Sequence, residues 1–501
     1  MGFFNTIINK YAAKRLSEID NFKKNPIQTQ EKIFFDLILK AKNTEFGKKY
    51  QYSTIKNYND FKQNVPVQEY ETLKPYIERL LNGEQNIFFP QKINWFAKSS
   101  GTTDARSKFI PISKDFLESC HFQGGNDVFF IYNNSFPNTK VFSKKTLSIG
   151  GCTSISKNGN ARIGDLSAVI ISNLPTWSQI NTINKKIVLI PEWDKKLDQI
   201  VKSTYNKDIS QIIGVPSWLK VLLENLLDFT GKNNILEIWH NLELFVHGGI
   251  SFSPYKESYK KLIPSEKMNY LETYNASEGF FGIQDEFITK KNDFLLMLDY
   301  GIFYEFIELT DYHKNNLKTI PLSEVKTDVN YVLVISTNGG LWRYIIGDTV
   351  QFTSKNPYKF IITGRTKHFI NCFGEELMIH NADTAIAYAC KKTNSNIKEY
   401  TAAPLFYENN ESQGTHEWLF EFEKEPENID VFVKLLDEKL REVNSDYDAK
   451  RFKNITIGFP KYTIVPKGTF LKWLETNKKL GGQNKVQRLS NNRKFLESLF
   501  P

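Results

Sequence analysis

Cysteine and histidine are scarce in this chain, and their spacing excludes several classes of site. The 501 residues include four cysteines, Cys120, Cys152, Cys372 and Cys390, with no C-x-x-C spacing. That usage predicts reduced thiols in a cytoplasmic protein and argues against a disulfide framework or a zinc site. The seven histidines form no H-x-x-x-H pair, so a metal cage built from side chains is not expected.

Long apolar runs and blocks of a single charge are also missing. No stretch reaches the roughly eighteen consecutive apolar residues of a membrane-spanning helix, and no secretory leader is evident. Lysine and arginine outnumber the acids 65 to 56, a formal charge of +9, and they are scattered. We expect a monomer with neither a membrane nor a nucleic-acid partner, whereas anionic small substrates remain compatible with this charge. Residues 1–6 match a loose myristoylation pattern, but we interpret them as the start of an amphipathic helix.

Apolar side chains, in contrast, are plentiful enough for a large core. They make up 41% of the sequence and aromatics 14%. Single cores stop growing near about 250–300 residues, so the length predicts more than one domain. We place the boundary at a polar, charged break, residues 363–368, which separates an N-terminal domain, 1–365, from a C-terminal domain, 366–501.

One polar stretch, residues 95–108, stands out as a candidate anion-binding loop. It reads W-F-A-K-S-S-G-T-T-D-A-R-S-K, and its hydroxyl residues are Ser99, Ser100, Thr102 and Thr103. Hydroxyls and backbone N–H groups bind phosphate, and Gly101 allows the backbone to approach an anion closely. The Gly-Lys-Ser/Thr of a nucleotide-triphosphate loop is absent, so a polar turn between two strands remains an alternative.

The order of periodic segments predicts an α/β fold. Residues 1 to about 90 have helical spacing, and Ser113 is a good N-cap for a following helix. Apolar runs at 147–149, 187–190, 212–215 and 244–246 then alternate with helices, including one that begins near Pro216. That alternation predicts a largely parallel sheet, with ligand loops after its strands at 247–249 and 274–279.

The pattern changes in the second half. Short strands between residues 293 and 363 predict an antiparallel sheet or small barrel. The remainder, from about 371, predicts a smaller α+β unit with a helix from 429 to 443. Near the end, two glycines before Lys485 and Arg488 predict a mobile, cationic loop.

Taken in order, the motifs resemble those of a known superfamily. The chain has S-S-G-T-T, Gly-Gly after a strand, Y-N-A-S-E, Y-I-I-G-D, G-R-x-K-x-x-I-x-x-x-G-E and K-x-x-R. This order resembles the adenylate-forming enzymes: acyl-CoA synthetases, luciferases and peptide-synthetase adenylation domains. Within that superfamily, W-F-A-K-S-S-G-T-T, G-V-P-S-W, H-G-G and G-E-E-L are most similar to bacterial members of the Gretchen Hagen family of acyl acid amido synthetases.

The resemblance covers nearly the whole chain and implies a fold and an activity. The fold would be a large N-terminal domain of mixed sheets covered by helices, with a small β-barrel-like part and a smaller, mobile α+β lid. The activity would be ATP-dependent adenylation of a carboxylic acid, release of pyrophosphate, and transfer of the acyl group to an amino acid. ATP and Mg²⁺ are the implied cofactors, and the partners are small-molecule acids and amino acids.

The resemblance also implies residue roles around the nucleotide. Ser99, Ser100, Gly101, Thr102 and Thr103 would grip the β- and γ-phosphates. Glu278 would hold Mg²⁺ as a catalytic residue, with a solvated loop acid as the alternative. The groups expected to line the adenine and α-phosphate are Gly248, Gly249, Tyr274, Asn275, Ala276 and Ser277; a tight turn at the glycines and core packing of the tyrosine are the alternatives.

Three further residues complete the implied site. Asp348 would accept hydrogen bonds from both ribose hydroxyls, and Arg365 would reach ribose or phosphate. Lys485 would approach the α-phosphate and the acyl oxygen and stabilise the adenylation transition state. Lys450 and Lys467 are alternative lysines for that role.

Two functional alternatives remain open. An acid–thiol (CoA) ligase would share the fold, and a non-catalytic nucleotide-binding relative would retain it without turnover. From chain position alone, we expect the acyl pocket to involve residues 116–132, 166–175 and 215–218.

Overall fold

A computed structural model shows the chain as two compact units. It describes residues 2–99, 108–149, 155–175, 182–190, 192–249, 252, 255–287, 292–366, 369–370, 372–373, 375, 377–407, 410–451, 457–477 and 486–500. The first unit comprises 1–250, 260–346 and 351–361, and the second comprises 251–259, 347–350 and 362–501. The domain boundary predicted at residue 365 stays a prediction.

The first 90 residues are helical, as their spacing predicts. The helices are α1 (Gly2–Lys24), α2 (Pro26–Ala41), α3 (Glu45–Lys49), α4 (Tyr58–Asn64), α5 (Tyr70–Leu81) and the 3₁₀ turn η1 (Tyr52–Thr54). Pro26 stands at the first position of α2, where its missing N–H costs no hydrogen bond. Phe34, Leu37, Ile38 and Ala41 recur on one face of α2 and are buried.

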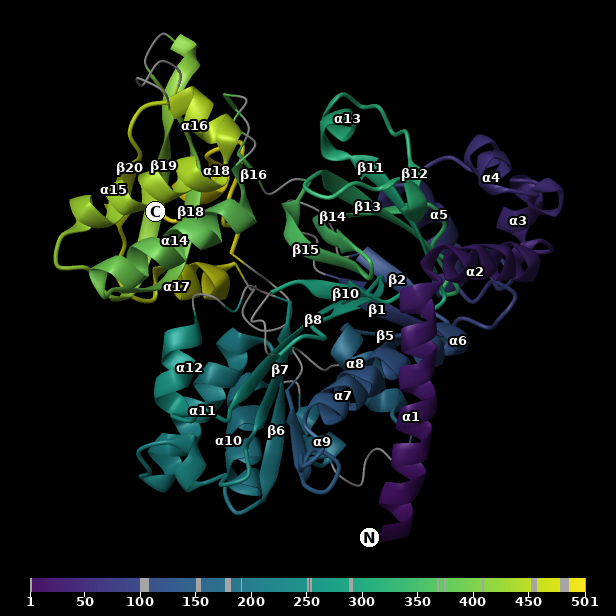
Figure 1. Cartoon of the computed structure of the whole chain (residues 1–501), viewed down its shortest axis with the longest axis horizontal. Helices are drawn as coiled ribbons and strands as arrows, with labels where there is room; N and C mark the ends of the chain where they lie inside the picture. The colour runs from purple at the N-terminus through teal and green to yellow at the C-terminus, as the bar shows by residue number, and fades with distance from the viewer. Residues whose placement is uncertain are drawn as a thin grey trace. The chain divides into compact units, whose positions relative to one another are not determined.

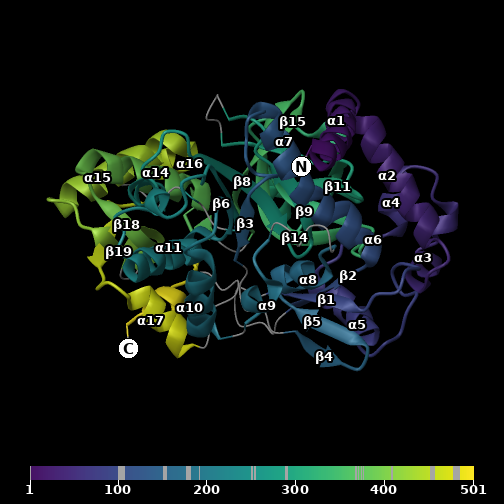
Figure 2. The same cartoon turned by 90° about the horizontal axis from the view of Figure 1, so that it is seen from below.

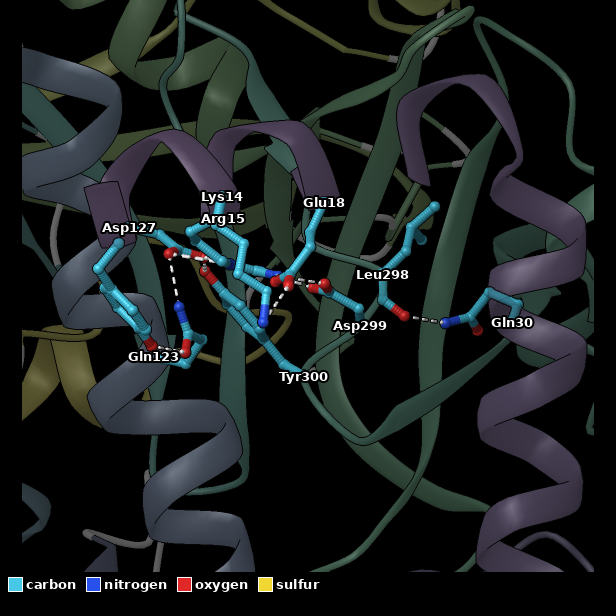
Figure 3. Close-up of polar contacts among 10 residues, drawn as sticks. Lys14, Arg15, Glu18, Gln30, Gln123, Asp127, Leu298, Asp299 and Tyr300 are labelled. Atoms are coloured by element: carbon cyan, nitrogen blue, oxygen red, sulfur yellow. Dashed lines mark hydrogen bonds and ion pairs between the residues drawn. The ribbon is translucent and has the colours of Figure 1, made fainter. Parts of the chain in front are cut away.

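Helix α1 is fixed to the first unit by a buried guanidinium. Figure 3 shows Arg15 between two carboxylates, Asp127 of α7 (Gln123–Ser135) and Asp299. Its Nη2 lies 2.8 Å from Asp127 Oδ2 and 2.9 Å from Asp299 Oδ1. From the next helix, Gln30 donates to the Leu298 carbonyl at 2.8 Å. Both overall views accordingly place α1 beside α7 (Figures 1 and 2).

A four-stranded sheet frames the candidate anion loop. Its order is β2 (Lys108–Ile112), β1 (Trp95–Ser99), β5 (Ala161–Gly164) and β4 (Ser156–Asn158). Strands β1 and β2 are antiparallel, and Ser99 pairs with Lys108 at their ends. Ser113 then caps α6 (Lys114–Phe116) as predicted, because its Oγ accepts from Phe116 N at 3.0 Å. The chain continues through a π-helical segment, η2 (Leu117–Phe122), into α7.

The largest sheet has eleven strands and combines two predicted parts. The order is β12 (Ile320–Pro321), β11 (Ile302–Glu308), β13 (Asn330–Thr337), β14 (Tyr344–Lys355), β15 (Tyr358–Arg365), β10 (Phe294–Leu296), β9 (Gly279–Ile283), β8 (Asn269–Ala276), β7 (Leu244–Gly248), β6 (Ile209–Gly214) and β3 (Lys145–Ser148). Strands β3, β6, β7 and β8 are parallel, as predicted. The antiparallel strands predicted for residues 293–363 are confirmed, and they are continuous with the parallel strands in one sheet. The antiparallel pair β8–β9 joins them to the parallel strands.

Among the described residues up to the end of β15, the other helices connect or flank these strands. They are α8 (Leu166–Asn173), α9 (Lys185–Val188), α10 (Trp193–Thr204), α11 (Pro216–Thr230), α12 (Lys256–Leu262), α13 (Leu309–His313) and the 3₁₀ turns η4 (Ile235–Glu237) and η6 (Leu322–Glu324). Helix α11 begins at Pro216 as predicted, and Figures 1 and 2 show it with α10 beside the parallel strands.

The strand predicted at 187–190 is wrong, because the segment begins in a helical turn. Asn184 initiates α9: its side-chain Oδ1 accepts from Lys186 N and its carbonyl accepts from Ile187 N. A run of four apolar residues does not distinguish a short strand from a helix, so the local cap decides the conformation.

The second unit is an α+β structure with its own core. Its elements are β16 (Phe369–Ile370), β17 (Leu377–Met378), α14 (Ile379–Thr393), β18 (Asn396–Tyr407), β19 (Asn410–Lys424), α15 (Ile429–Val443), α16 (Ser445–Arg451), β20 (Lys461–Ile464), α17 (Thr469–Thr476) and α18 (Lys494–Glu497). Helix α15 has the predicted bounds, and α14 and α15 lie together by the β18–β19–β20 sheet (Figures 1 and 2). Within the described ranges, no helix combines the length and apolarity needed to cross a bilayer.

Candidate nucleotide and metal site

The predicted metal residue lies on a buried two-residue turn. Strands β8 and β9 are antiparallel, with Ala276 paired to Gly279, so Ser277 and Glu278 form the connection. Only 2% of Ser277 and 7% of Glu278 is accessible to solvent. Connections between strands usually lie at the surface, because their backbone groups need water. The burial rules out the alternative of a solvated loop acid for Glu278.

Aromatic side chains pack within and against this hairpin. Tyr274 is buried, and its ring centroid lies 4.8 Å from that of Phe281 and 6.1 Å from that of Phe360. Packing in the core is therefore shown for Tyr274, and contact with adenine remains a prediction. Between Tyr274 and Asn275 the pairing shifts by one residue, and such bulges change the direction of the side chains that follow.

Asn275 has a polar partner that the sequence did not single out. His121 of η2 is buried, and its Nδ1 lies 3.1 Å from Asn275 Oδ1. Burial lowers the pKa of His121 to about 4, while the hydrogen bond to Asn275 raises it. A lone histidine in a helical stretch gives no signal of such a partner, so only the fold identifies the pair.

The two glycines after β7 are both required by the local backbone. A Cβ on Gly248 would lie 2.5 Å from the carbonyl oxygen of Thr273 on β8, which is a severe clash. Gly249 has φ +82°, a conformation that residues with a side chain rarely adopt. A tight, crowded turn therefore accounts for both glycines, and their predicted passage of adenine remains a prediction.

The hydroxyl loop is described only at its two ends. Ser99 is the last residue of β1, and Lys108 is the first of β2. Ser100, Gly101, Thr102 and Thr103 lie outside the described residues. Lys108 Nζ lies 3.3 Å from the hydroxyl of Tyr344, the first residue of β14. The strand ends that carry the loop are thus described, whereas its phosphate contacts remain a prediction.

The predicted ribose-binding residues form an ion pair in the second unit. Arg365 Nε lies 2.8 Å from Asp348 Oδ1, with the Asp348 side chain 8% exposed and that of Arg365 39% exposed. Gly347, with φ +91°, precedes the aspartate, and its carbonyl accepts from Thr366 N at 2.8 Å. The structure brings these two predicted residues together and holds their backbones side by side.

The C-terminal lysine motif is described only from its second residue onward. Lys485 lies outside the described residues. Arg488 is buried, and its Nη1 lies 3.1 Å from Asp383 Oδ1 while its Nε lies 3.0 Å from Glu399 Oε1. Its carbonyl accepts a hydrogen bond from the backbone N–H of Ala402, a residue of β18, at 2.8 Å. Arg488 is therefore an anchored core residue, and the prediction of a mobile cationic loop is wrong at this position.

Comparison with known families covers most of the chain. Models of the GH3 family N-terminal domain, central domain and C-terminal domain match residues 15–268, 295–365 and 380–494. The chain belongs to the GH3 family. The family predicted from the motif order is thereby confirmed, and its central domain ends at the residue that pairs with Asp348.

Curated GH3 relatives match at low identity over long stretches. An indole-3-acetic acid-amido synthetase of Arabidopsis thaliana, GH3.3, is 23% identical, covering 91% of this chain and 88% of the relative. A 4-substituted benzoates-glutamate ligase of the same plant, GH3.12, is 22% identical, covering 98% and 97%.

Solved structures confirm the predicted fold class. The GH3.15 acyl acid amido synthetase aligns with a TM-score of 0.77 at 18% identity, covering 97% of this chain and 95% of that one. A 2-hydroxyisobutyryl-CoA ligase in its postadenylation state aligns with a TM-score of 0.59 at 12% identity, covering 94% and 90%. The GH3 chain therefore has the fold of adenylate-forming ligases.

The residues at the β8–β9 turn are compatible with Mg²⁺. The ion prefers oxygen ligands and is commonly held by one or two carboxylates together with substrate phosphates. Glu278 supplies a carboxylate and Ser277 a hydroxyl whose oxygen has no hydrogen-bond partner among the described residues. Within that same set there is no group of three or more histidine, cysteine or acidic residues that would form an all-protein metal cage.

Proposed function

We propose that this GH3 protein activates a carboxylic acid with ATP and then joins it to an amino acid. A carboxylate oxygen would attack the α-phosphorus of ATP, and the bond to pyrophosphate would break. The amino nitrogen would next attack the acyl carbon, lose its proton and expel AMP. Membership of the GH3 family and the amido synthetase names of its relatives support this assignment.

The observation that carries the proposal is the buried Glu278 at the β8–β9 turn. A carboxylate is costly to bury, so a fold retains one where a cation or a hydrogen-bond network compensates for it. Mg²⁺ bound there would supply positive charge near the phosphates of ATP. Glu278 would hold that ion, and the donors of the hydroxyl loop would bind the β- and γ-phosphates.

Asp348, Arg365 and Lys485 complete the proposed chemistry. The ion pair with Arg365 fixes one oxygen of Asp348, which orients the carboxylate for ribose hydroxyls. Lys485 would approach the α-phosphate and neutralise charge that develops during adenylation. Rotation of the smaller domain between the two steps, which adenylate-forming enzymes are known for, would bring the lysine in and later remove it.

The test uses purified full-length protein, Mg-ATP and a panel of aromatic and aliphatic acids. The panel should include indole-3-acetate and 4-substituted benzoates, because the relatives are named for these acids. Acid-dependent exchange of pyrophosphate into ATP would show adenylation, and amide formation with amino acids such as glutamate would show the second step. A thioester with coenzyme A in place of an amide would select the CoA ligase, and ATP binding without turnover on any acid would select the non-catalytic relative.

A further inference from the structure

Three consecutive residues of the π-helical segment η2 contact three different parts of the large sheet. Ser119 Oγ accepts from Asn338 Nδ2 at 2.9 Å, in the turn after β13. Cys120 Sγ accepts from Phe280 N of β9 at 3.1 Å. His121 Nδ1 lies 3.1 Å from Asn275 Oδ1 of β8. Segments of π-helix are rare and frequently occur at functional sites, and this one directs two polar side chains to the β8–β9 hairpin.

The packing around this contact leaves little freedom. The rings of Phe116 and His121 lie 5.1 Å apart in an edge-to-face arrangement. A Cβ on Gly124 would lie 2.5 Å from the ring of Phe280, so α7 can approach β9 this closely only with glycine there. Only 3% of His121 is exposed, which means that the imidazole cannot reach a ligand itself. Any effect of His121 on a ligand must pass through the residue that it holds.

The hydrogen bond sets the orientation of the Asn275 side chain. An amide oxygen only accepts, so Nδ1 of the neutral imidazole must carry the proton. The Oδ1 atom is thereby held against η2, and the two N–H groups of Asn275 Nδ2 face away from His121. Within the described part of the chain, Nδ2 makes no hydrogen bond, and Asn275 itself is partly accessible to solvent.

Two further polar atoms at this location lack partners. Among the described residues, His121 Nε2 and Ser277 Oγ are both buried without a hydrogen bond. Buried polar atoms without partners are rare in native proteins, because each costs about 1–3 kcal/mol. Ser277 belongs to the turn that holds Glu278, two residues after Asn275, and Nε2 belongs to the histidine that Asn275 contacts. The arrangement is typical of a site prepared for a ligand and not of a packed core.

We infer that His121 is a positioning residue for ATP, which acts by holding the Asn275 amide so that its Nδ2 donors face an acceptor atom of the nucleotide. The inference rests on the proposed function, since it assumes that ATP binds at this hairpin. His121 itself takes no part in the chemistry. It excludes the flipped amide, in which the oxygen of Asn275 would face the nucleotide acceptor and repel it.

The experiment measures the dissociation constant of Mg-ATP by direct titration of the full-length protein. His121→Phe keeps an aromatic ring and removes the donor, so ATP should bind about 5- to 30-fold more weakly, as expected for one misdirected hydrogen bond. His121→Asn places an amide N–H near the position of Nδ1 and should recover most of the affinity. Cys120→Ser is the matched control, because it changes the adjacent residue of η2 and leaves the contact to Asn275 intact.

A double-mutant cycle separates positioning from general damage to the fold. If His121 acts only through Asn275, adding His121→Phe to Asn275→Ala should weaken ATP binding no further than Asn275→Ala alone. Additive losses, or an equal loss in Cys120→Ser, would overturn the inference. So would unchanged ATP affinity in His121→Phe while the wild type catalyses acid-dependent pyrophosphate exchange, a result that leaves the proposed function intact. Weakened binding in a protein that shows no such exchange would instead support the inference and contradict the proposed function.

Discussion

Replacing Arg15 by methionine should release helix α1 from the first unit. The Arg15 guanidinium contacts both oxygens of Asp127, at 2.8 to 3.1 Å, and both oxygens of Asp299, at 2.5 and 2.9 Å. Figure 3 shows that the three side chains come from segments far apart in the sequence. Methionine keeps most of the apolar stem of Arg15 and removes every one of these contacts.

The size of the expected loss of stability follows from the burial of Asp127. Its side chain is 0% exposed, so in the variant its charge would stay buried, and among the described residues the donors left to it are Tyr300 and Gln123, each at 2.7 Å. Breaking a buried ion pair by removing one partner typically costs about 3–5 kcal/mol. The adjacent Lys14 is the control: it is 78% exposed and lies 3.9 Å from Glu18, a pair worth about 0–1 kcal/mol.

Amide hydrogen exchange measures the stability of α1 in the two variants. The free energy for opening α1 should fall enough in Arg15→Met to reduce amide protection on the order of 10²–10³-fold, whereas Lys14→Met should change it by less than about fivefold. Equal protection in the two variants would show that the buried contacts do not hold α1. Because α7 follows η2 directly, loss of protection should extend to the helix that continues from His121.

The loss of stability caused by Arg15→Met should also depend on pH. Burial raises the pKa of Asp127, and Arg15 opposes that rise, so the variant should have a still higher pKa at this carboxyl. A carboxyl with a raised pKa in the folded state contributes its stability below its ordinary pKa and loses it as pH increases through the folded value. The difference in the free energy for opening α1 between wild type and Arg15→Met should therefore be smaller at pH 5 than at pH 8. A difference that grows as the pH is lowered would refute the role assigned to Asp127.

Three predictions concern the proposed reaction. Glu278→Gln keeps the shape of the buried side chain and removes its charge, so pyrophosphate exchange should fall by about 10²-fold or more, and exchange at the wild-type rate would contradict the metal role. Asp348→Ala removes the acceptor held by Arg365 and should weaken Mg-ATP binding roughly 10- to 100-fold without changing acid binding, which titration of each ligand checks. Lys485→Ala should reduce exchange by about 10²–10³-fold at nearly constant ATP affinity. If Lys450→Ala or Lys467→Ala has that effect instead, the lysine is misassigned.

Local signals in the sequence predicted individual elements well. Ser113, Pro216 and the apolar spacing of 429–443 each depend on neighbours within a few residues, and the corresponding elements form as expected. Continuity of the large sheet also depends on the pairing of β10 with β15, in which Phe294 lies opposite Phe360, and no local pattern reveals it. The prediction of a strand at 187–190 was wrong because of a local signal. The side chain of Asn184 accepts a hydrogen bond at the start of α9, and the apolar run that follows does not form a strand.

At the candidate site, residue type was predictable and surroundings were not. The motif order identified Glu278 and Asp348, but neither the burial of the first nor the ion pair of the second follows from spacing. His121 and Arg488 act through partners more than 80 residues away in the chain. Their roles depend on tertiary contacts alone, and a single sequence has no signal for them.

The two described parts of the nucleotide site differ in how they are held. Glu278 and Ser277 lie on a buried turn between two strands whose residues Tyr274 and Phe281 pack ring against ring, so displacement of the turn would disturb the core around Tyr274. The Asp348 carboxylate contacts the partly exposed Arg365, and a backbone hydrogen bond from Thr366 to Gly347 holds the neighbouring chain. Packed cores resist deformation, whereas water partly screens an ion pair whose arginine is partly exposed. The proposed metal residue is thus built into the more rigid part, which suits a group that must meet the phosphates in a fixed geometry.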